Sequence, residues 1–159
     1  MKYILQPLLR VRLYREDQAA NAMIQQRRRV AAAEAELERR RKDLADYEVW
    51  RVRREEEIWQ SVIGKEVLNK DLDDLKLDLQ IVWAGQVERQ EAVFAGEKSL
   101  EEERAKLMDA IVAHQKAMRS REKLDIHKEM WRSSVLKEQE YAAELELEDF
   151  KVRKADSAA

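Results

Sequence analysis

The chain has 159 residues, of which 40% are charged and 6% aromatic, and it contains three glycines, one proline and no cysteine. Abundant Ala, Glu, Lys, Leu and Arg at helical spacing is typical of a coiled coil, and the lack of cysteine excludes disulfides and thiolate metal sites. The formal net charge of −2 argues against a dedicated nucleic-acid-binding protein, which needs a strongly basic face.

The N-terminal part of the sequence predicts one long helix. Residues 1–7 read as a short extended lead, and helix-forming residues then follow without a break from about residue 8 to residue 63. Pro7 suits the first turn of such a helix, where its missing N–H group does no harm. A heptad stripe along this helix predicts a partner helix on one face. The stripe comprises Ala19, Met23, Gln26, Val30, Ala33, Leu37, Arg40, Leu44 and Tyr47.

A short break and a second long helix follow. Gly64 is a suitable helix end, and Asn69 can cap the next helix, so we expect a turn at about residues 64–69. The second helix is predicted at about residues 70–150, with a frayed tail at residues 151–159. Its heptad stripe comprises Leu72, Leu75, Leu79, Val82, Gln86, Val93, Leu100, Leu107 and Ile111. We therefore predict an all-α fold, a long two-helix antiparallel coiled-coil hairpin that forms a single domain over residues 1–159.

The second arm of this hairpin is predicted to outrun the first. If the turn centres near Lys65, facing residues have numbers that sum to roughly 130, which places the Arg27–Arg29 run opposite residues 101–103. Residues beyond about Leu124 then have no facing arm, although their heptad pattern continues through Val135 and Leu145. An uncovered amphipathic helix predicts a binding element. A different protein is the favoured partner, and a second copy of the chain is the alternative.

The sequence shows no catalytic or metal-binding constellation. His114 and His127 lack metal-ligand spacing, and His114 falls on the heptad stripe. Paired carboxylates such as Asp73 and Asp74 are expected in so acidic a helix, and a rod has no concave site to tune them. We therefore expect no enzyme activity, no cofactor and no metal site.

Aromatic residues gather near the predicted turn. Trp50 lies off the stripe, and Trp83 is adjacent to the stripe residue Val82. Because tryptophan is enriched at binding hot spots, we expect a docking patch formed by Trp50, Trp59, Trp83 and Gln86. The alternative is a locally wider core in which the heptad phase shifts after Tyr47.

Both ends of the chain carry a family resemblance. The opening run Tyr3-Ile4-Leu5-Gln6-Pro7-Leu8-Leu9-Arg10-Val11-Arg12 resembles the start of the YscO family of type III secretion proteins, relatives of the flagellar protein FliJ. So does the later run His127-Lys128-Glu129-Met130-Trp131, followed by Leu136-Lys137-Glu138. Length and two-arm layout agree, whereas residues from about 15 to 122 match only in heptad character.

The resemblance implies a cytoplasmic stalk, peripheral at the inner-membrane export apparatus and not inserted in the membrane. Such proteins are similar to the γ subunit of rotary ATPases. They are expected to bind the secretion ATPase hexamer and couple it to the cytosolic domain of the export gate, and some bind secretion chaperones. The ATPase-binding candidates are Leu8, Leu9, Arg10, Arg12, His127, Lys128, Trp131, Val135 and Leu145. The candidates for binding the export gate or a chaperone are Trp50, Trp59, Trp83 and Gln86.

A rival reading belongs to a different functional class. In it, the chain is a structural homodimeric coiled-coil spacer or adaptor that makes no contact with an ATPase. Oligomeric state separates the two readings, because a γ-like stalk should be monomeric when dilute and a spacer should be a stable dimer.

Overall fold

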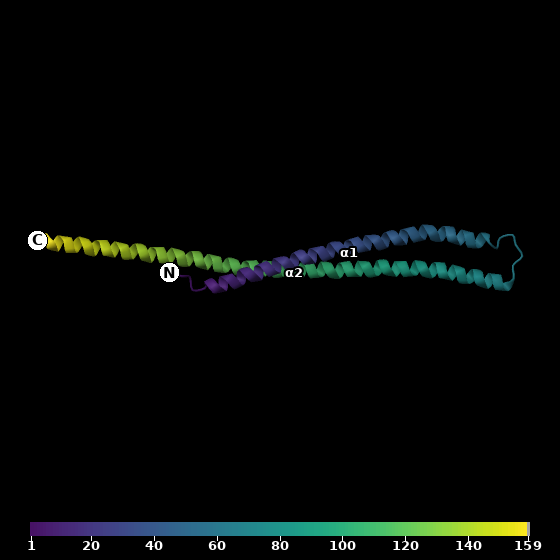
Figure 1. Ribbon diagram of the computed structural model, residues 1–159, viewed down its shortest axis with the longest axis horizontal. Coiled ribbons are helices and arrows are strands. Elements are labelled where there is room, and N and C mark those ends of the chain that lie inside the picture. The colour runs from purple at the N-terminus through teal and green to yellow at the C-terminus, as the bar shows by residue number, and fades with distance from the viewer. Residues whose placement is uncertain (159) are drawn as a thin grey trace. The chain divides into compact units, whose positions relative to one another are not determined.

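The computed structural model describes residues 1–158 and consists of two α-helices joined by a turn (Figure 1). Helix α1 spans Gln6–Gln60 and helix α2 spans Asn69–Ser157, with 55 and 89 residues. No strand occurs in the described residues. The two helices pack against each other as a helical hairpin, which confirms the predicted fold class.

The turn begins earlier than expected. The backbone amides of Val62 and Ile63 both donate to the carbonyl oxygen of Trp59, at 3.1 Å each, and this tight turn ends α1 before Gly64. Gly64 then adopts a left-handed conformation with φ of 74°, which a residue without a Cβ atom adopts at little cost. At the start of α2 the backbone amide of Leu68 donates to Asp71 Oδ2 at 3.1 Å, so Asp71 satisfies the helix terminus that we had assigned to Asn69.

Helix α2 also ends later than expected. It continues through residues 151–157, which we had predicted to be part of a frayed tail, and Ala159 lies outside the described residues. No glycine or proline follows Gly96, and Lys154 is favourably placed in the last turn beside the negative end of the helix dipole. The helix-forming residues after Phe150 therefore simply extend α2.

The chain divides into two compact units, through both of which the two helices run. One unit is Ala22–Ala110, which we call the hairpin unit. The other combines Met1–Asn21 with Ile111–Ala159, and we call it the terminal unit. Our expectation of a single domain over residues 1–159 stays a prediction.

The predicted stripes form the seam of the hairpin unit. Ile58, Leu75 and Val82 are buried together, with Val62 and Leu79 packed against them. Leu37 and Leu100 are buried farther along. Leu72 is the one predicted stripe residue of this unit that is exposed, because it lies in the first turn of α2.

Polar side chains fix the register of this seam. Tyr47 Oη donates to the carbonyl oxygen of Val82 at 2.7 Å, and Gln26 Nε2 donates to that of Glu103 at 2.9 Å. These pairs agree with the antiparallel register predicted from the turn. Gln26 Nε2 also donates to the Glu103 carboxylate. We had expected the nearby arginine run, residues 27–29, to make this contact instead.

Gly85 makes the tyrosine contact possible. A Cβ atom at residue 85 would overlap the Tyr47 hydroxyl group, so only glycine allows that group to approach α2. The Arg89 guanidinium lies 3.9 Å from the Tyr47 ring centroid and donates to the Gly85 carbonyl oxygen at 3.0 Å. A tyrosine, a glycine and an arginine thus form one interlocked polar contact across the seam.

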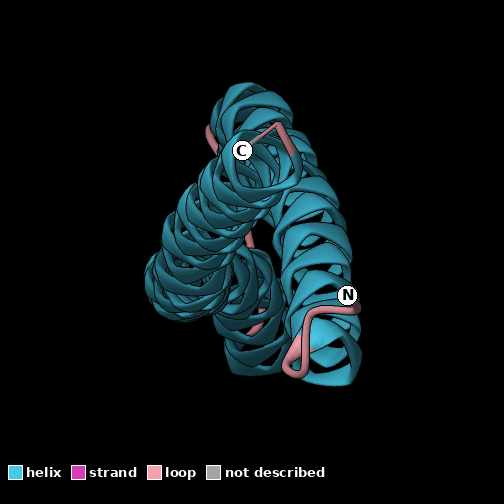
Figure 2. Cartoon of the chain, turned by 90° about the vertical axis from the view of Figure 1, so that its left-hand side faces the viewer, coloured by secondary structure: helices cyan, strands magenta, loops and turns pink. Residues whose placement is uncertain are grey.

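The N-terminal lead of the terminal unit is not extended. Figure 2 shows the lead as a loop at the N-terminus. The lead folds back so that the Tyr3 hydroxyl group is hydrogen-bonded to His127 Nδ1 at 2.6 Å, and the Tyr3 ring lies 5.3 Å from that of Trp131. Tyr3 is buried, as is Leu124. The uncovered part of α2 therefore begins after Val135 and not at Leu124, because the lead occupies the space that we had expected to be empty.

Candidate binding surfaces

Three surfaces are candidates for binding other molecules. We name the folded-back lead with its supporting helices, residues 1–12 and 120–132, the N-terminal clasp. We name residues 136–157 the free segment. The third surface surrounds the turn of the hairpin unit.

The clasp is held together by several of the predicted ATPase-binding residues. Leu9 is buried, Arg12 donates to the Ser120 carbonyl oxygen at 2.6 Å, and Lys128 donates to Gln6 Oε1 at 2.8 Å. Trp131 is partly buried against Tyr3. These side chains therefore have a structural role in the clasp. Leu8 and Arg10 are exposed to solvent, and so is His127, although it is also hydrogen-bonded to Tyr3.

The clasp surrounds a positively charged hollow of about 640 Å³. Four lysine or arginine residues line it and no acidic residue does, whereas Ile4 beside them is 86% exposed. The lining residues are Met1, Lys2, Tyr3, Ile4, Gln6, Pro7, Arg10, Lys128, Trp131 and Arg132. Sequence reasoning missed Lys2, Ile4 and Arg132. The spacing of Lys128 and Arg132 could have indicated a basic face on α2. No sequence pattern indicated that the lead folds back onto this helix.

The free segment is helical and exposed along its whole length. Val135, just before it, is half-buried, and every residue from Leu136 to Ser157 is exposed. Its large apolar residues are Leu136, Tyr141, Leu145, Leu147, Phe150 and Val152. Its carboxylates between residues 138 and 149 are Glu138, Glu140, Glu144, Glu146, Glu148 and Asp149. Residues 138–149 of this segment thus combine an uncovered apolar surface with six carboxylates and no basic residue.

The tryptophans near the turn are about half exposed, at 47% for Trp50, 50% for Trp59 and 48% for Trp83. Trp50 packs against Tyr47 at a ring-centroid distance of 5.1 Å, and the Arg51 guanidinium lies 4.3 Å from the Trp83 ring centroid. Arg51 is partly buried, so the heptad stripe continues without a phase shift. This arrangement speaks against the locally wider core.

The predicted docking patch is not one continuous surface. Gln86 is only 8% exposed, and its Oε1 atom is buried without a hydrogen-bond partner. We had placed Gln86 on the surface because it is close to Trp83 in the sequence. Gln86 is buried because it lies on the heptad stripe that faces the other helix. Trp59 follows Trp50 by nine residues, which is about half a revolution around the helix, so the two lie on opposite faces of α1.

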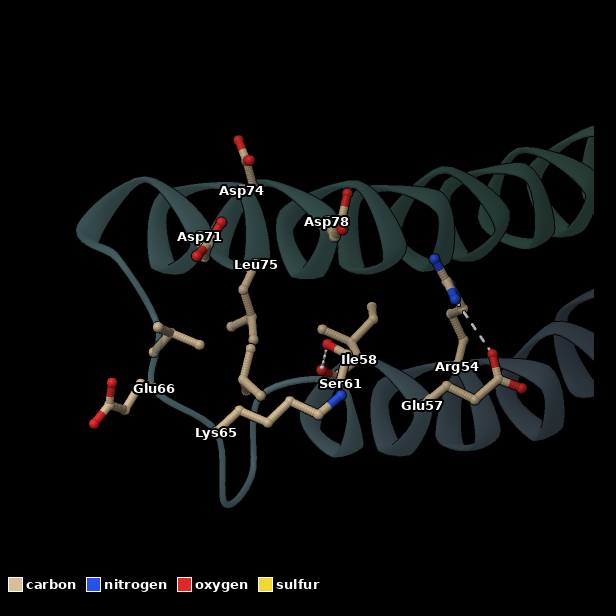
Figure 3. Close-up of a pocket in the computed structure, with 12 residues that line it drawn as sticks. Arg54, Glu57, Ile58, Ser61, Lys65, Glu66, Asp71, Asp74, Leu75 and Asp78 are labelled. Carbon is tan, nitrogen blue, oxygen red and sulfur yellow. Dashed lines mark hydrogen bonds and ion pairs between the residues drawn. The ribbon is translucent and has the colours of Figure 1, made fainter.

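A second hollow, of about 520 Å³, lies beside the turn (Figure 3). Figure 3 shows Leu75 of α2 and Ile58 of α1 pointing into the space between the two helices, where they are buried in one cluster. Arg54 forms an ion pair with Glu57 at 3.2 Å. The carboxylates of this hollow are Glu57, Glu66, Asp71, Asp74 and Asp78. Within residues 1–158 no group of three His, Cys, Asp or Glu residues could hold a metal ion. In the same range no helix is long and apolar enough to cross a membrane.

Side-chain hydrogen bonds and ion pairs shift the pKa values of four charged groups, which are Glu36, Arg39, Glu103 and Arg121. Hydrogen bonds from Arg39 and Arg40 lower the pKa of Glu36 to about 2. The hydrogen bond from Gln26 lowers the pKa of Glu103, and hydrogen bonds to Glu16 and Asp125 raise the pKa of Arg121. Glu103 and Arg121 make their bonds between α1 and α2, so they bear on how the helices pair.

The fold and these surfaces define a class of protein: a helical hairpin whose exposed features are apolar and charged helix faces. The chain belongs to the YscO family, because the family model "Type III secretion protein YscO" matches residues 5–153. No curated protein matched the chain.

Two solved structures are similar to the chain. Type III secretion protein YscO from Vibrio parahaemolyticus is 29% identical, with a TM-score of 0.86 and 92% of each chain covered. A putative YscO homologue from Chlamydia trachomatis is 21% identical, with a TM-score of 0.77, over 94% of this chain and 92% of the other. The second likeness supports the fold alone.

Proposed function

We propose that this YscO-family protein is a cytoplasmic stalk of a type III secretion system, working at the inner-membrane export apparatus. Its terminal unit binds the secretion ATPase hexamer, and its hairpin unit contacts the cytosolic domain of the export gate. Binding of secretion chaperones is a second use of the hairpin surface. The observation that carries the proposal is the uncovered free segment in a chain of this family.

The apolar residues of the free segment lie on two faces of the helix. At 100° per residue, Tyr141, Leu145 and Val152 cluster on one side, roughly 170° away from the side that carries Leu147 and Phe150. One partner helix can cover only one of these faces. A ring that encloses the segment covers both, which is why a hexamer lumen suits this surface better than a flat partner.

The exposed tryptophans support a separate contact for the hairpin unit. Trp83 packs against Arg51, and Trp50 packs against Tyr47, yet each tryptophan keeps about half of its surface exposed. A smaller side chain could make the same packing contact. Exposed tryptophan is favourable where a partner buries it. Replacing Trp83 with alanine should weaken binding to the gate domain and leave ATPase binding unchanged.

The decisive experiment is to titrate the cognate secretion ATPase with the full chain and with a chain ending at Val135. This truncation keeps Tyr3, His127 and Trp131 together, so the clasp remains intact. We expect the full chain to stimulate ATP turnover and the truncated chain to lose that effect. Equal behaviour of the two forms would contradict the assignment of the free segment to the ATPase.

Two single substitutions sharpen this test. Leu145→Ser and Leu147→Ser alter opposite faces of the free segment and have similar cost in the isolated helix. If a ring encloses the segment, both substitutions should weaken the stimulation of ATP turnover. If only one substitution weakens it, a single partner helix covers the segment. No stimulation by any form, with a dimer that persists on dilution, would favour the structural spacer.

A further inference from the structure

Two surfaces of the terminal unit match each other in charge and polarity. The clasp hollow is lined by Lys2, Arg10, Lys128 and Arg132 without any carboxylate, whereas residues 138–149 of the free segment carry six carboxylates. Both surfaces also expose large apolar side chains. We propose that the free segment of one copy docks in the clasp hollow of a second copy, forming a reversible antiparallel dimer.

The free segment cannot reach the hollow of its own chain. Helix α2 is continuous to Ser157, with no glycine or proline after Gly96. Glu140 follows Arg132 by eight residues and therefore lies about 12 Å farther along the same straight helix. Only a second chain can bring the carboxylates to the hollow.

A two-fold arrangement satisfies both contacts at once. If two α2 helices run antiparallel with Leu136 facing its copy, then Glu140 of one copy lies at the level of Arg132 of the other, and Glu144 lies at the level of Lys128. Because a two-fold interface is isologous, the contact between free segment and hollow occurs twice in the dimer. Ile4 at the rim of each hollow then meets an apolar face of the incoming helix.

The dimer would cover the surfaces that we assign to the ATPase, so the ring would bind the monomer. This consequence rests on the proposed function, but the dimer itself does not. A reversible dimer also differs from a permanent spacer, because it dissociates when diluted.

The test is sedimentation equilibrium of the full chain in the absence of any ATPase. We expect a monomer–dimer equilibrium that shifts within roughly 1 to 100 µM and weakens with added salt. A chain that stays monomeric to the upper end of this range would overturn the proposal and leave the ATPase assay unaffected.

Charge reversal identifies the contact. The variant Lys2→Glu with Arg132→Glu cancels the net positive charge of the hollow, and Glu140→Lys with Glu144→Lys lowers the net charge of residues 138–149 from −6 to −2. Each variant alone should raise the dimer dissociation constant at least about tenfold, because several exposed ion pairs become repulsive. Their equimolar mixture should associate more tightly than either variant alone, since one contact of the mixed dimer is the wild-type contact and the other joins the reversed residues of the two variants.

A matched control removes the effect of total charge. Arg27→Glu with Arg28→Glu changes the net charge by the same amount in the hairpin unit and should leave the dimer unchanged. Circular dichroism verifies that every variant remains helical. Failure of the mixture to associate would reject this contact even if the wild-type chain dimerises, and would point to another interface or to an acidic segment of another protein in the hollow.

Discussion

The hairpin unit and the free segment use similar helix-forming residues in opposite ways. In the hairpin unit the heptad stripe is covered by a facing helix, and Leu37 is only 4% exposed. In the free segment Leu147 is 61% exposed, although the helix around it is equally regular. Helix propensity thus accounts for helix formation in both regions, and pairing alone distinguishes a stabilising leucine from one available to a partner.

The same type of substitution, leucine to alanine, made in each region is the strongest test of this difference. Leu37→Ala should lower the free energy of unfolding by about 2 to 4 kcal/mol, because it leaves a gap in a packed seam. Leu147→Ala should change it by less than about 0.5 kcal/mol, since its side chain has no packing to lose. Urea unfolding followed by circular dichroism measures both, with the chain diluted below the concentrations at which the proposed dimer forms. Similar costs at the two sites would show that the free segment is covered in solution.

A smaller effect is expected at the polar contact of the seam. Gly85→Ala improves helix propensity but displaces the Tyr47 hydroxyl group, so we expect a net loss of about 1 to 2 kcal/mol. The equivalent exchange at an exposed helix glycine would stabilise. A double-mutant cycle with Tyr47→Phe should give a combined loss smaller than the sum of the single losses. Additive losses would mean that the two residues do not interact.

Acid should weaken the hairpin unit through Glu103. Its folded pKa is lowered by Gln26, so its stabilising contribution is present above the ordinary carboxyl value and is lost as the pH falls through the folded pKa. We expect the melting temperature to decrease as the pH is lowered below about 4.5. We expect Glu103→Gln to reduce this pH dependence. Thermal melts at stepped pH measure it. An unchanged profile in the variant would remove Glu103 from the explanation.

The smallest effect concerns the free segment alone. Glu140, Glu144 and Glu148 follow one another at helical spacing, where like charges oppose helix formation by about 0.2 to 0.5 kcal/mol per pair. Glu144→Gln should therefore slow amide hydrogen exchange in residues 140–150 slightly and leave the hairpin unit unaffected. Slower exchange in the hairpin unit would show that the two regions unfold together.

Much of the fold is readable from the sequence because heptad spacing specifies both helices and their partners. Leu37, Val82 and Leu100 are buried as the stripe predicts. The end of α2 was misplaced because no residue after Phe150 stops a helix, and the sequence offers no positive signal for fraying. Helix boundaries depend on such weak local preferences, whereas the seam depends on a repeated pattern.

The candidate surfaces were less predictable for a different physical reason. The burial of Tyr3 depends on contacts with His127 and Trp131, which are distant in sequence and belong to no repeat. The basic hollow exists only because the lead returns to α2. Likewise, the seam position of Gln86 decides its burial, although its chain neighbour Trp83 is exposed.

Four hydrogen bonds across the helices share a form that has a consequence for mutational tolerance. Arg12, Gln26, Arg40 and Tyr47 of α1 each donate to a backbone carbonyl oxygen of α2. A carbonyl oxygen is present whatever side chain its residue carries. Replacement of an accepting residue can therefore preserve the bond if the helix persists, whereas replacement of a donor removes it. Deep mutational scanning should accordingly find these four α1 positions far more restricted than Ser120 and Ala92, which are two of the four accepting positions.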